Sequence, residues 1–163
     1  VCGELLDEIK TSDGLISALI YSPPGEGKTT LLRDAAHKLS HGEEALRGCV
    51  IDTRGEIYLR ELFSDGIADV MHGYPRAKGM EIAARTMSAQ LIVCDEIGPA
   101  AEADAIISVA NTGVPLLASA HGSSLSDIMR RPQLKRLADA GIFEKYIGIR
   151  RLGSGFSLSV DTL

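Results

Sequence analysis

The sequence contains no tryptophan, and aromatic residues make up only 4% of its 163 positions. Single-stranded nucleic acid is usually bound by stacking its bases on aromatic side chains, so the chain has few platforms for such binding. Basic residues are also in deficit, because 17 Lys and Arg face 22 Asp and Glu, a formal net charge of −5. A domain that coats duplex DNA would be expected to be basic. We therefore expect no nucleic-acid partner, although a local basic groove is compatible with this balance.

Cysteines and long apolar runs are scarce as well. Cys2, Cys49 and Cys94 are odd in number and lack the spacing of a metal site. They are expected to be reduced core residues in a reducing cytosol. No apolar run approaches the ~18 residues that a membrane span needs, and residues 1–10 lack the pattern of a signal peptide. The length, with 45% apolar and 24% charged residues, predicts about one globular domain.

Short apolar runs alternate with amphipathic stretches, a pattern that predicts an α/β fold with a mostly parallel sheet. Strands are expected at residues 15–21, 48–52, 91–95 and 114–120, and helices at 28–40, 80–87 and 102–111. Another helix is expected to begin at Leu125, to be interrupted by Pro132 and to end before Gly141. Residues 142–150 and 156–160 alternate apolar and polar side chains, which predicts an antiparallel pair. Between residues 53 and 79, periodicity does not decide between short strands and a turn of helix.

The strongest motif is SPPGEGKT at residues 22–29, between an expected strand and an expected helix. It is a phosphate-binding loop with Ser22 in place of the usual first glycine. Its backbone N–H groups and the helix N-terminus favour phosphate oxygens. Lys28 can reach the β- and γ-phosphates, and the Thr29 hydroxyl can hold Mg²⁺. The residues predicted to bind the nucleotide are Pro24, Gly25, Glu26, Gly27, Lys28, Thr29 and Thr30. A Gly/Pro turn beside a chance Lys-Thr pair is disfavoured by the strand–loop–helix context.

The second motif is LIVCDE at residues 91–96, an apolar strand that ends in two carboxylates. We expect Asp95 to bind Mg²⁺ and Glu96 to polarise the attacking water. The alternative, a solvated acidic pair after a core strand, loses weight beside a phosphate loop. Small-molecule kinases need no such water-activating carboxylate, and the Asn-Lys-X-Asp motif of GTPases does not occur. ATP hydrolysis is therefore favoured over group transfer and over guanine switching.

Further candidates follow other expected strands, where ligands of open α/β sheets bind. His121 is predicted to sense the γ-phosphate, and Glu56 to support the metal or its water. Arg76 or Arg85 is predicted to reach a neighbouring subunit's γ-phosphate. A structural histidine, a salt-bridged turn and a solvated helix face are the respective alternatives.

Together these residues resemble a known family. The runs SPPGEGKTTLLRD, IDTRGEI, GYPRAKGM, ARTMSAQLIVCDEIG and ASAHGSSLSDIMRRPQL are similar to the stage III sporulation protein AA family, over about residues 15–152. That family resembles the hexameric ATPases of type II and type IV secretion systems and pili. The resemblance implies a RecA-like P-loop ATPase core, a single ATPase domain over residues 1–163, which lacks the N-terminal domain of that family.

The resemblance also implies roles and partners. Lys28 and Thr29 would form the nucleotide loop, Asp95 and Glu96 the metal and catalytic pair, and His121 the histidine box. Residues 52–56 would match the acidic box, and Arg76 and Arg85 the arginine region of the secretion ATPases. Asp95 departs from those ATPases, which usually carry Gly before the glutamate. The implied partners are ATP, Mg²⁺, further copies of the chain in a ring such as a hexamer, and membrane-channel proteins of the sporulation apparatus.

The main hypothesis is a cytoplasmic, Mg²⁺-dependent ATPase at the membrane around the developing spore, where it would power or gate a secretion-like channel. A nucleic-acid-linked P-loop ATPase is the first alternative. The second is a binding module that uses ATP only as a structural switch, against which Lys28, Asp95 and Glu96 argue.

Overall fold

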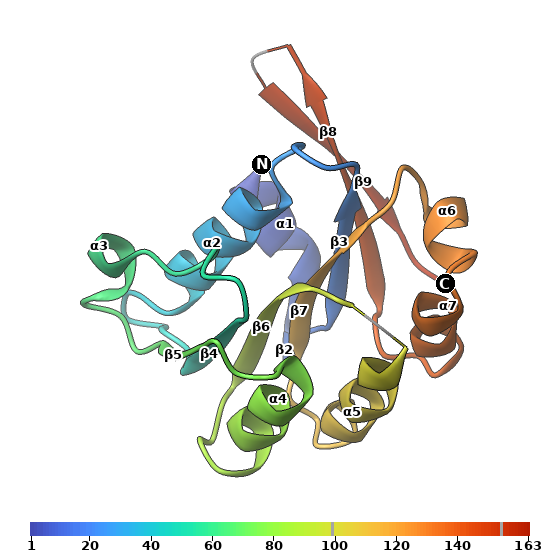
Figure 1. Ribbon diagram of the computed structural model, residues 1–163. Helices are drawn as coiled ribbons and strands as arrows, with labels where there is room; N and C mark the ends of the chain where they lie inside the picture. Colours follow the sequence, from blue (N-terminus) through green and yellow to red (C-terminus); the bar gives the residue numbers. More distant parts are fainter. Residues whose placement is uncertain (99, 154) are drawn as a thin grey trace.

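The computed structural model describes residues 1–98, 100–153 and 155–163, which fold around one seven-stranded sheet (Figure 1). The strand order is β5-β4-β6-β7-β3-β8-β9, and every neighbouring pair is parallel except β8 and β9, which are antiparallel. The strands are β3 (Ala18–Ser22), β4 (Gly48–Asp52), β5 (Asp69–His72), β6 (Leu91–Glu96), β7 (Leu116–His121), β8 (Lys145–Leu152) and β9 (Gly155–Asp161). The predicted α/β fold with a mostly parallel sheet is confirmed.

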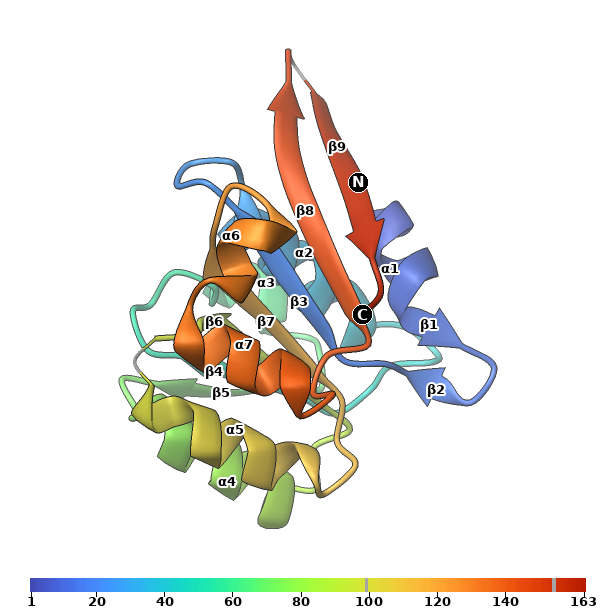
Figure 2. The same cartoon turned by 90° about the vertical axis from the view of Figure 1, so that its right-hand side faces the viewer.

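Helices cover both faces of this sheet (Figure 2). They are α1 (Cys2–Ile9), α2 (Lys28–Leu39), α3 (Arg60–Phe63), α4 (Arg76–Arg85), α5 (Ala101–Ala110), α6 (Leu125–Met129) and α7 (Pro132–Asp139). A small hairpin of β1 (Lys10–Thr11) and β2 (Gly14–Leu15) follows α1. None of the described helices has the length and apolar character that crossing a membrane requires.

The core has two layers, one on each face of the sheet. Along β6, Ile92 and Cys94 pack toward α4 and α5, whereas Leu91 and Val93 pack toward α1 and α2. Because successive side chains of a strand point to opposite faces, a strand covered on both sides must be apolar throughout. The continuous apolar run of LIVC therefore reflects burial on both faces. The three cysteines are free and buried, as expected of core residues.

Several boundaries differ from the predicted ones. The first strand of the sheet begins at Ala18, since Leu15 pairs with Lys10 in the small hairpin. Helix α4 begins at Arg76, four residues earlier than predicted, and it contains Gly79. The segment left undecided contains both a helical turn, α3, and a strand, β5. Residues 2–9 form a helix that was not predicted.

A predicted helix break and a predicted strand pair are confirmed. Pro132 occupies the start of α7 and separates it from α6, which suits a residue that lacks the N–H and fixes φ. The last two strands form an antiparallel hairpin, with Arg151 opposite Phe156. This hairpin extends beyond the body of the domain at one end (Figures 1 and 2).

Candidate functional site

The carboxyl ends of the parallel strands surround a cavity of about 430 Å³. Ligands of open α/β sheets bind at this edge, because loops and helix N-termini converge there. The lining residues come from the phosphate loop, the segment after β4, and the ends of β6 and β7. They are Gly25, Gly27, Lys28, Thr29, Thr30, Arg54, Glu56, Asp95, Glu96, Ser119 and His121.

The phosphate loop has the backbone that its two glycines permit. Gly25 and Gly27 have φ of +81° and +93°, in the left-handed region that side-chain-bearing residues rarely adopt. Gly27 is the N-cap of α2, so the first N–H groups of this helix face the cavity side of the loop. The loop thus lies at a helix N-terminus, as its position between an expected strand and an expected helix predicts.

Lys28 is buried and turned back onto its own loop. Its three N–H donors face the carbonyl oxygens of Ser22 (2.9 Å) and Pro23 (3.1 Å) and Ser22 Oγ (3.1 Å), and they are shared with a fourth acceptor, His121. Burial lowers the pKa of Lys28, and the charge of Glu96 partly counteracts this effect. The acceptors around Lys28 Nζ are all uncharged. A phosphate is negatively charged and therefore a stronger acceptor, so it can replace them at the ammonium group.

His121 connects this lysine to Glu96. Lys28 Nζ lies 3.0 Å from His121 Nδ1, and His121 Nε2 lies 3.0 Å from Glu96 Oε2. An ammonium group can only donate, so Nδ1 accepts and the imidazole proton is assigned to Nε2, facing the carboxylate. Arg54 Nη1 lies 3.4 Å from the same Glu96 oxygen. The predicted water-activating carboxylate is therefore held from two sides.

Asp95 lies in a buried ion network. Its Oδ1 accepts from Arg76 Nε at 3.1 Å and also from Nη2, and Arg76 Nη1 donates to Glu102 at 2.7 Å. Glu102 in turn accepts from the backbone N–H of Gly98. Burial raises the pKa of Asp95, against the opposing effect of the Arg76 guanidinium. The network ties the end of β6 to the starts of α4 and α5.

The other oxygen of Asp95 has no hydrogen-bond partner among the described residues, although it is buried. Such orphaned acceptors are rare and call for a ligand or water. Since Asp95 and Thr29 line the same cavity, the arrangement fits a magnesium ion bound beside the phosphate loop. The described residues contain no cluster of three or more His, Cys, Asp or Glu that could hold a metal alone. Proteins commonly bind Mg²⁺ through one or two side chains together with nucleotide phosphates.

Asp52 holds the segment that carries Glu56. Its carboxylate is fully buried and accepts from the backbone N–H groups of residues 56, 57 and 58, at 2.9–3.0 Å. Arg33 of α2 donates to the carbonyl of Ile57 from the other side. Glu56 itself is exposed and faces the cavity, as its predicted supporting role requires.

Neither of the two predicted arginines lines the cavity. Arg76 is buried within its own chain by Asp95 and Glu102, so the expectation that it projects toward a neighbour is corrected. Arg85 is at the opposite end of α4, where it approaches Ser108 of α5 at 3.5 Å, and it does not line the cavity. Of the loop residues, Pro24 is exposed and Glu26 turns toward the β8–β9 hairpin, so neither lines the cavity.

Arg54 and Ser119 line the cavity but were not among the predicted site residues. The sequence does indicate Arg54, because this residue lies two positions after β4, in the run IDTRGEI. Nothing in the sequence indicates Ser119, because it lies inside the apolar run of β7. It reaches the cavity through its register beside Glu96.

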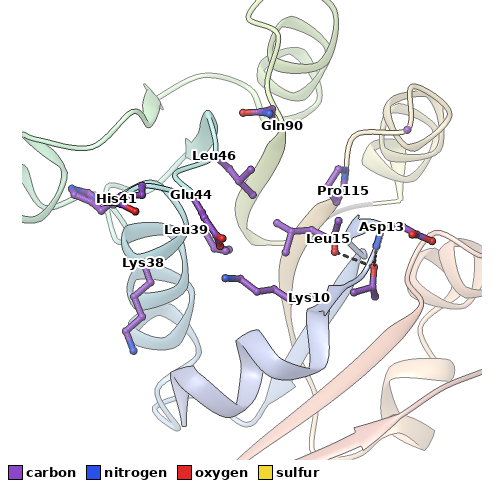
Figure 3. A pocket seen from close by; sticks show the side chains of 14 residues that line it. Lys10, Asp13, Leu15, Lys38, Leu39, His41, Glu44, Leu46, Gln90 and Pro115 are labelled. Atoms are coloured by element: carbon purple, nitrogen blue, oxygen red, sulfur yellow. Dashed lines mark hydrogen bonds between the residues drawn. The ribbon is translucent and has the colours of Figure 1, made fainter.

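A larger opening, of about 880 Å³, lies near the amino ends of the parallel strands (Figure 3). The β1–β2 hairpin, the end of α2 and the residues just before β6 and β7 surround it. Its charged residues are of both signs, including Lys10, Lys38, Asp13 and Glu44. It lies away from the carboxyl ends of the strands and from the phosphate loop, so it is not the candidate site.

The chain has relatives of known family. The family model described as "Sporulation stage III, protein AA" matches residues 1–155. Stage III sporulation protein AA of Bacillus subtilis (strain 168) is 39% identical over 145 residues, which cover 83% of this chain and 47% of that protein. The chain thus spans about half the length of this relative.

Two solved structures share the fold. The ATPase DotB of Legionella pneumophila superposes with a TM-score of 0.73 at 21% identity, over 98% of this chain and 48% of DotB. The VirB11 ATPase of the Brucella suis type IV secretion system gives 0.62 at 18% identity, over 90% of this chain and 48% of VirB11. The fold is that of a RecA-like P-loop ATPase core. A family match over 155 of its 163 residues, together with 39% identity to the Bacillus protein, makes this chain a member of the stage III sporulation protein AA family.

Proposed function

We propose that this chain is an Mg²⁺-dependent ATPase core that hydrolyses ATP at the carboxyl edge of its sheet. The observation that carries the proposal is the meeting of the phosphate loop with Asp95 and Glu96 in one cavity. The loop alone would support only nucleotide binding, and the acidic pair alone would support neither nucleotide binding nor hydrolysis. Their common cavity brings a phosphate site, a metal ligand and a candidate base together, as phosphoryl transfer to water requires.

Each residue then has a distinct task. Lys28 and the N–H groups of the loop bind the phosphates, and Thr29 and Asp95 hold Mg²⁺, which when bound neutralises phosphate charge. Glu96 polarises the attacking water and takes up its proton. His121 orients Glu96 through Nε2, and Glu56 and Arg54 lie across the cavity, where they can contact the γ-phosphate or its water.

The biological setting is part of the same proposal. Membership of the sporulation family and the likeness to secretion ATPases support a role as motor or gate of a channel between mother cell and forespore. The chain would act from the cytoplasm, at the membrane around the forespore, in a ring of identical subunits bound to membrane-channel proteins. The match covers 47% of the Bacillus relative, so the role of the whole protein belongs to the proposal.

Two variants test binding and chemistry separately. Lys28→Ala removes a charge and its phosphate hydrogen bonds, which contribute roughly 1.5–3 kcal/mol, so ATP affinity should fall by about 10- to 100-fold. Glu96→Gln preserves shape but cannot accept a proton, so ATP should stay bound while turnover falls by about 10²- to 10⁴-fold. Lys38→Ala, an exposed lysine at the end of the same helix, is the matched control and should change neither.

Calorimetric titration with ATP and a phosphate-release assay measure the two quantities. Unchanged ATP affinity in Lys28→Ala would exclude this loop as the phosphate site. Full turnover in Glu96→Gln would move the catalytic role, with Glu56 the next candidate. ATP binding without turnover, even at high protein concentration, would instead favour the nucleotide-switched binding module.

A further inference from the structure

The β8–β9 hairpin lies directly against the phosphate loop. A Cβ placed on Gly27 would lie 3.1 Å from Cε1 and 3.4 Å from Cζ of Phe156, so this ring packs over the loop backbone. The backbone N–H of Arg151 donates to Glu26 Oε2 at 2.6 Å. Arg151 and Phe156 are cross-strand partners, so one rung of the hairpin makes both contacts.

A small notch of about 70 Å³ opens beside this ring, on the α2 side of the loop. It is mostly apolar, with a hydroxyl and a carboxylate among its residues. They include Gly27, Thr30, Leu31, Asp34, Ile149 and Phe156. Thr30 and Leu31 belong to the first turn of α2 and Asp34 to the next, so the notch begins where the phosphate-binding turn ends.

Phe156 remains 41% exposed in this position. A large aromatic side chain at the edge of a notch, next to a phosphate loop, offers a face that packing within the chain leaves uncovered. A nucleotide whose phosphates occupy the loop has a ribose and a flat base to place within a short distance of the loop. Aromatic side chains and apolar walls are the surfaces on which such bases stack.

We propose that Phe156 and this notch form the subsite for the base of the bound nucleotide, which deepens and rests on the proposed ATPase function. The notch is smaller than a purine, so the base lies across its mouth against the exposed part of Phe156. Ile149 and Leu31 supply the apolar wall. The Asp34 carboxylate can accept a hydrogen bond from an exocyclic amino group. The hairpin thereby contacts the phosphate loop through Glu26 and would contact the base through Phe156.

The test compares a ligand with a base to one without. Affinities for ATP and for inorganic tripolyphosphate are measured by calorimetry, with Mg²⁺, in the full chain and in Phe156→Ala, Phe156→Tyr and Lys28→Ala. Leu152→Ala is the control, since Leu152 is 65% exposed on the same hairpin and lines neither the cavity nor the notch. Melting temperatures establish that each variant is folded.

Phe156→Ala should weaken ATP binding by about five- to tenfold and leave tripolyphosphate binding within about twofold. Phe156→Tyr, which keeps an aromatic ring, should bind ATP as the unchanged chain does. An equal loss of affinity for ATP and for tripolyphosphate would mean that Phe156 shapes the loop, and it would overturn the base subsite. Unchanged affinity for both ligands would overturn it as well. Lys28→Ala separates the two proposals. If Lys28→Ala leaves ATP affinity intact, the proposed ATPase function itself fails. If Lys28→Ala weakens ATP binding and Phe156→Ala does not, only the base subsite fails.

Discussion

His121 lies between Lys28 and Glu96, with each of its ring nitrogens 3.0 Å from one of them. The lysine proposed to bind phosphate and the candidate base are thus joined through one imidazole. When a phosphate draws Lys28 away from Nδ1, the hydrogen bond on one side of the ring is lost while Nε2 still faces Glu96. The geometry gives the histidine at the end of β7 a means of responding to occupation of the loop.

Replacing His121 should therefore affect chemistry more than binding. His121→Ala leaves the phosphate loop intact but removes the group that orients Glu96, so turnover should fall by about 10- to 100-fold, the range for orienting partners. ATP affinity should stay within about threefold. His121→Gln, which keeps a donor and an acceptor, should recover part of the activity. A loss of ATP affinity as large as the loss of turnover would count against the orienting role.

Arg76 should matter for stability. It is the partner of a buried carboxylate, and both side chains are 6% exposed. Arg76→Ala leaves Asp95 buried without its counter-charge, a change that costs about 3–5 kcal/mol in comparable pairs. Urea denaturation should show the loss. Arg85→Ala on the same helix is the control, since this arginine is exposed and should change the free energy of unfolding by only about 0.5 kcal/mol or less. Equal stabilities of the two variants would refute the assignment.

The local parts of the fold and site were predictable from the sequence. The phosphate loop needs only its glycines, its lysine and a following helix, all within residues 22–40. The strand of Asp95 and Glu96 is recognisable from its apolar run. Helix α1 was missed because residues 1–10 are mixed and acidic, although buried Leu5 and Ile9 lie four residues apart on one face. The apolar run that contains Leu15 continues into the first strand of the sheet, so the pattern alone does not separate Leu15 from that strand.

Contacts between distant segments were not predictable in the same way. Arg76 and Asp95 are 19 residues apart, and their pairing depends on how α4 crosses the sheet before β6 begins. The sequence around Arg76 is the same whether this arginine faces a neighbouring subunit or pairs with the buried Asp95, so it does not distinguish the two. Phe156 lies 129 residues after Gly27, so its packing over the loop follows only from the sheet order that places β8 beside β3.

The cysteines provide a readout of folding. Burial raises the pKa of the Cys49 thiol to about 12, and burial likewise raises the pKa of Cys2 and Cys94. The thiolate is the reactive form, and in an unfolded chain its pKa is about 8.5. At pH 8 the native protein should therefore react with a thiol reagent far more slowly than the unfolded protein. Reaction rates in buffer and in urea, with labelled positions mapped by mass spectrometry, check this. Rapid native labelling of Cys49 would contradict its placement in the core.

Self-association should raise the specific ATPase activity if an arginine from a neighbour completes the site. An arginine supplied in trans can raise phosphoryl-transfer rates by about 10³–10⁵, so a dilute monomer that depends on one would be nearly inactive. The side chain of Arg54, 58% exposed and 3.4 Å from Glu96, is instead placed to act within its own chain. Of the two arginines predicted to act on a neighbour, Arg85 remains exposed, whereas Arg76 is buried.

Mixing experiments separate the two arginines. If Arg85 acts in trans, inactive Arg85→Ala subunits mixed with inactive Glu96→Gln subunits should regain activity, because a Glu96→Gln subunit can supply its intact arginine to the γ-phosphate in a neighbouring site that retains Glu96. Activity per subunit should also rise with protein concentration, measured alongside mass in solution. If Arg54 serves its own site, Arg54→Ala should abolish turnover, mixing should restore nothing, and activity per subunit should be constant. That second pattern would show a site complete within one chain, and the proposed ring would then serve mechanical work on the proposed channel and not the hydrolysis of ATP.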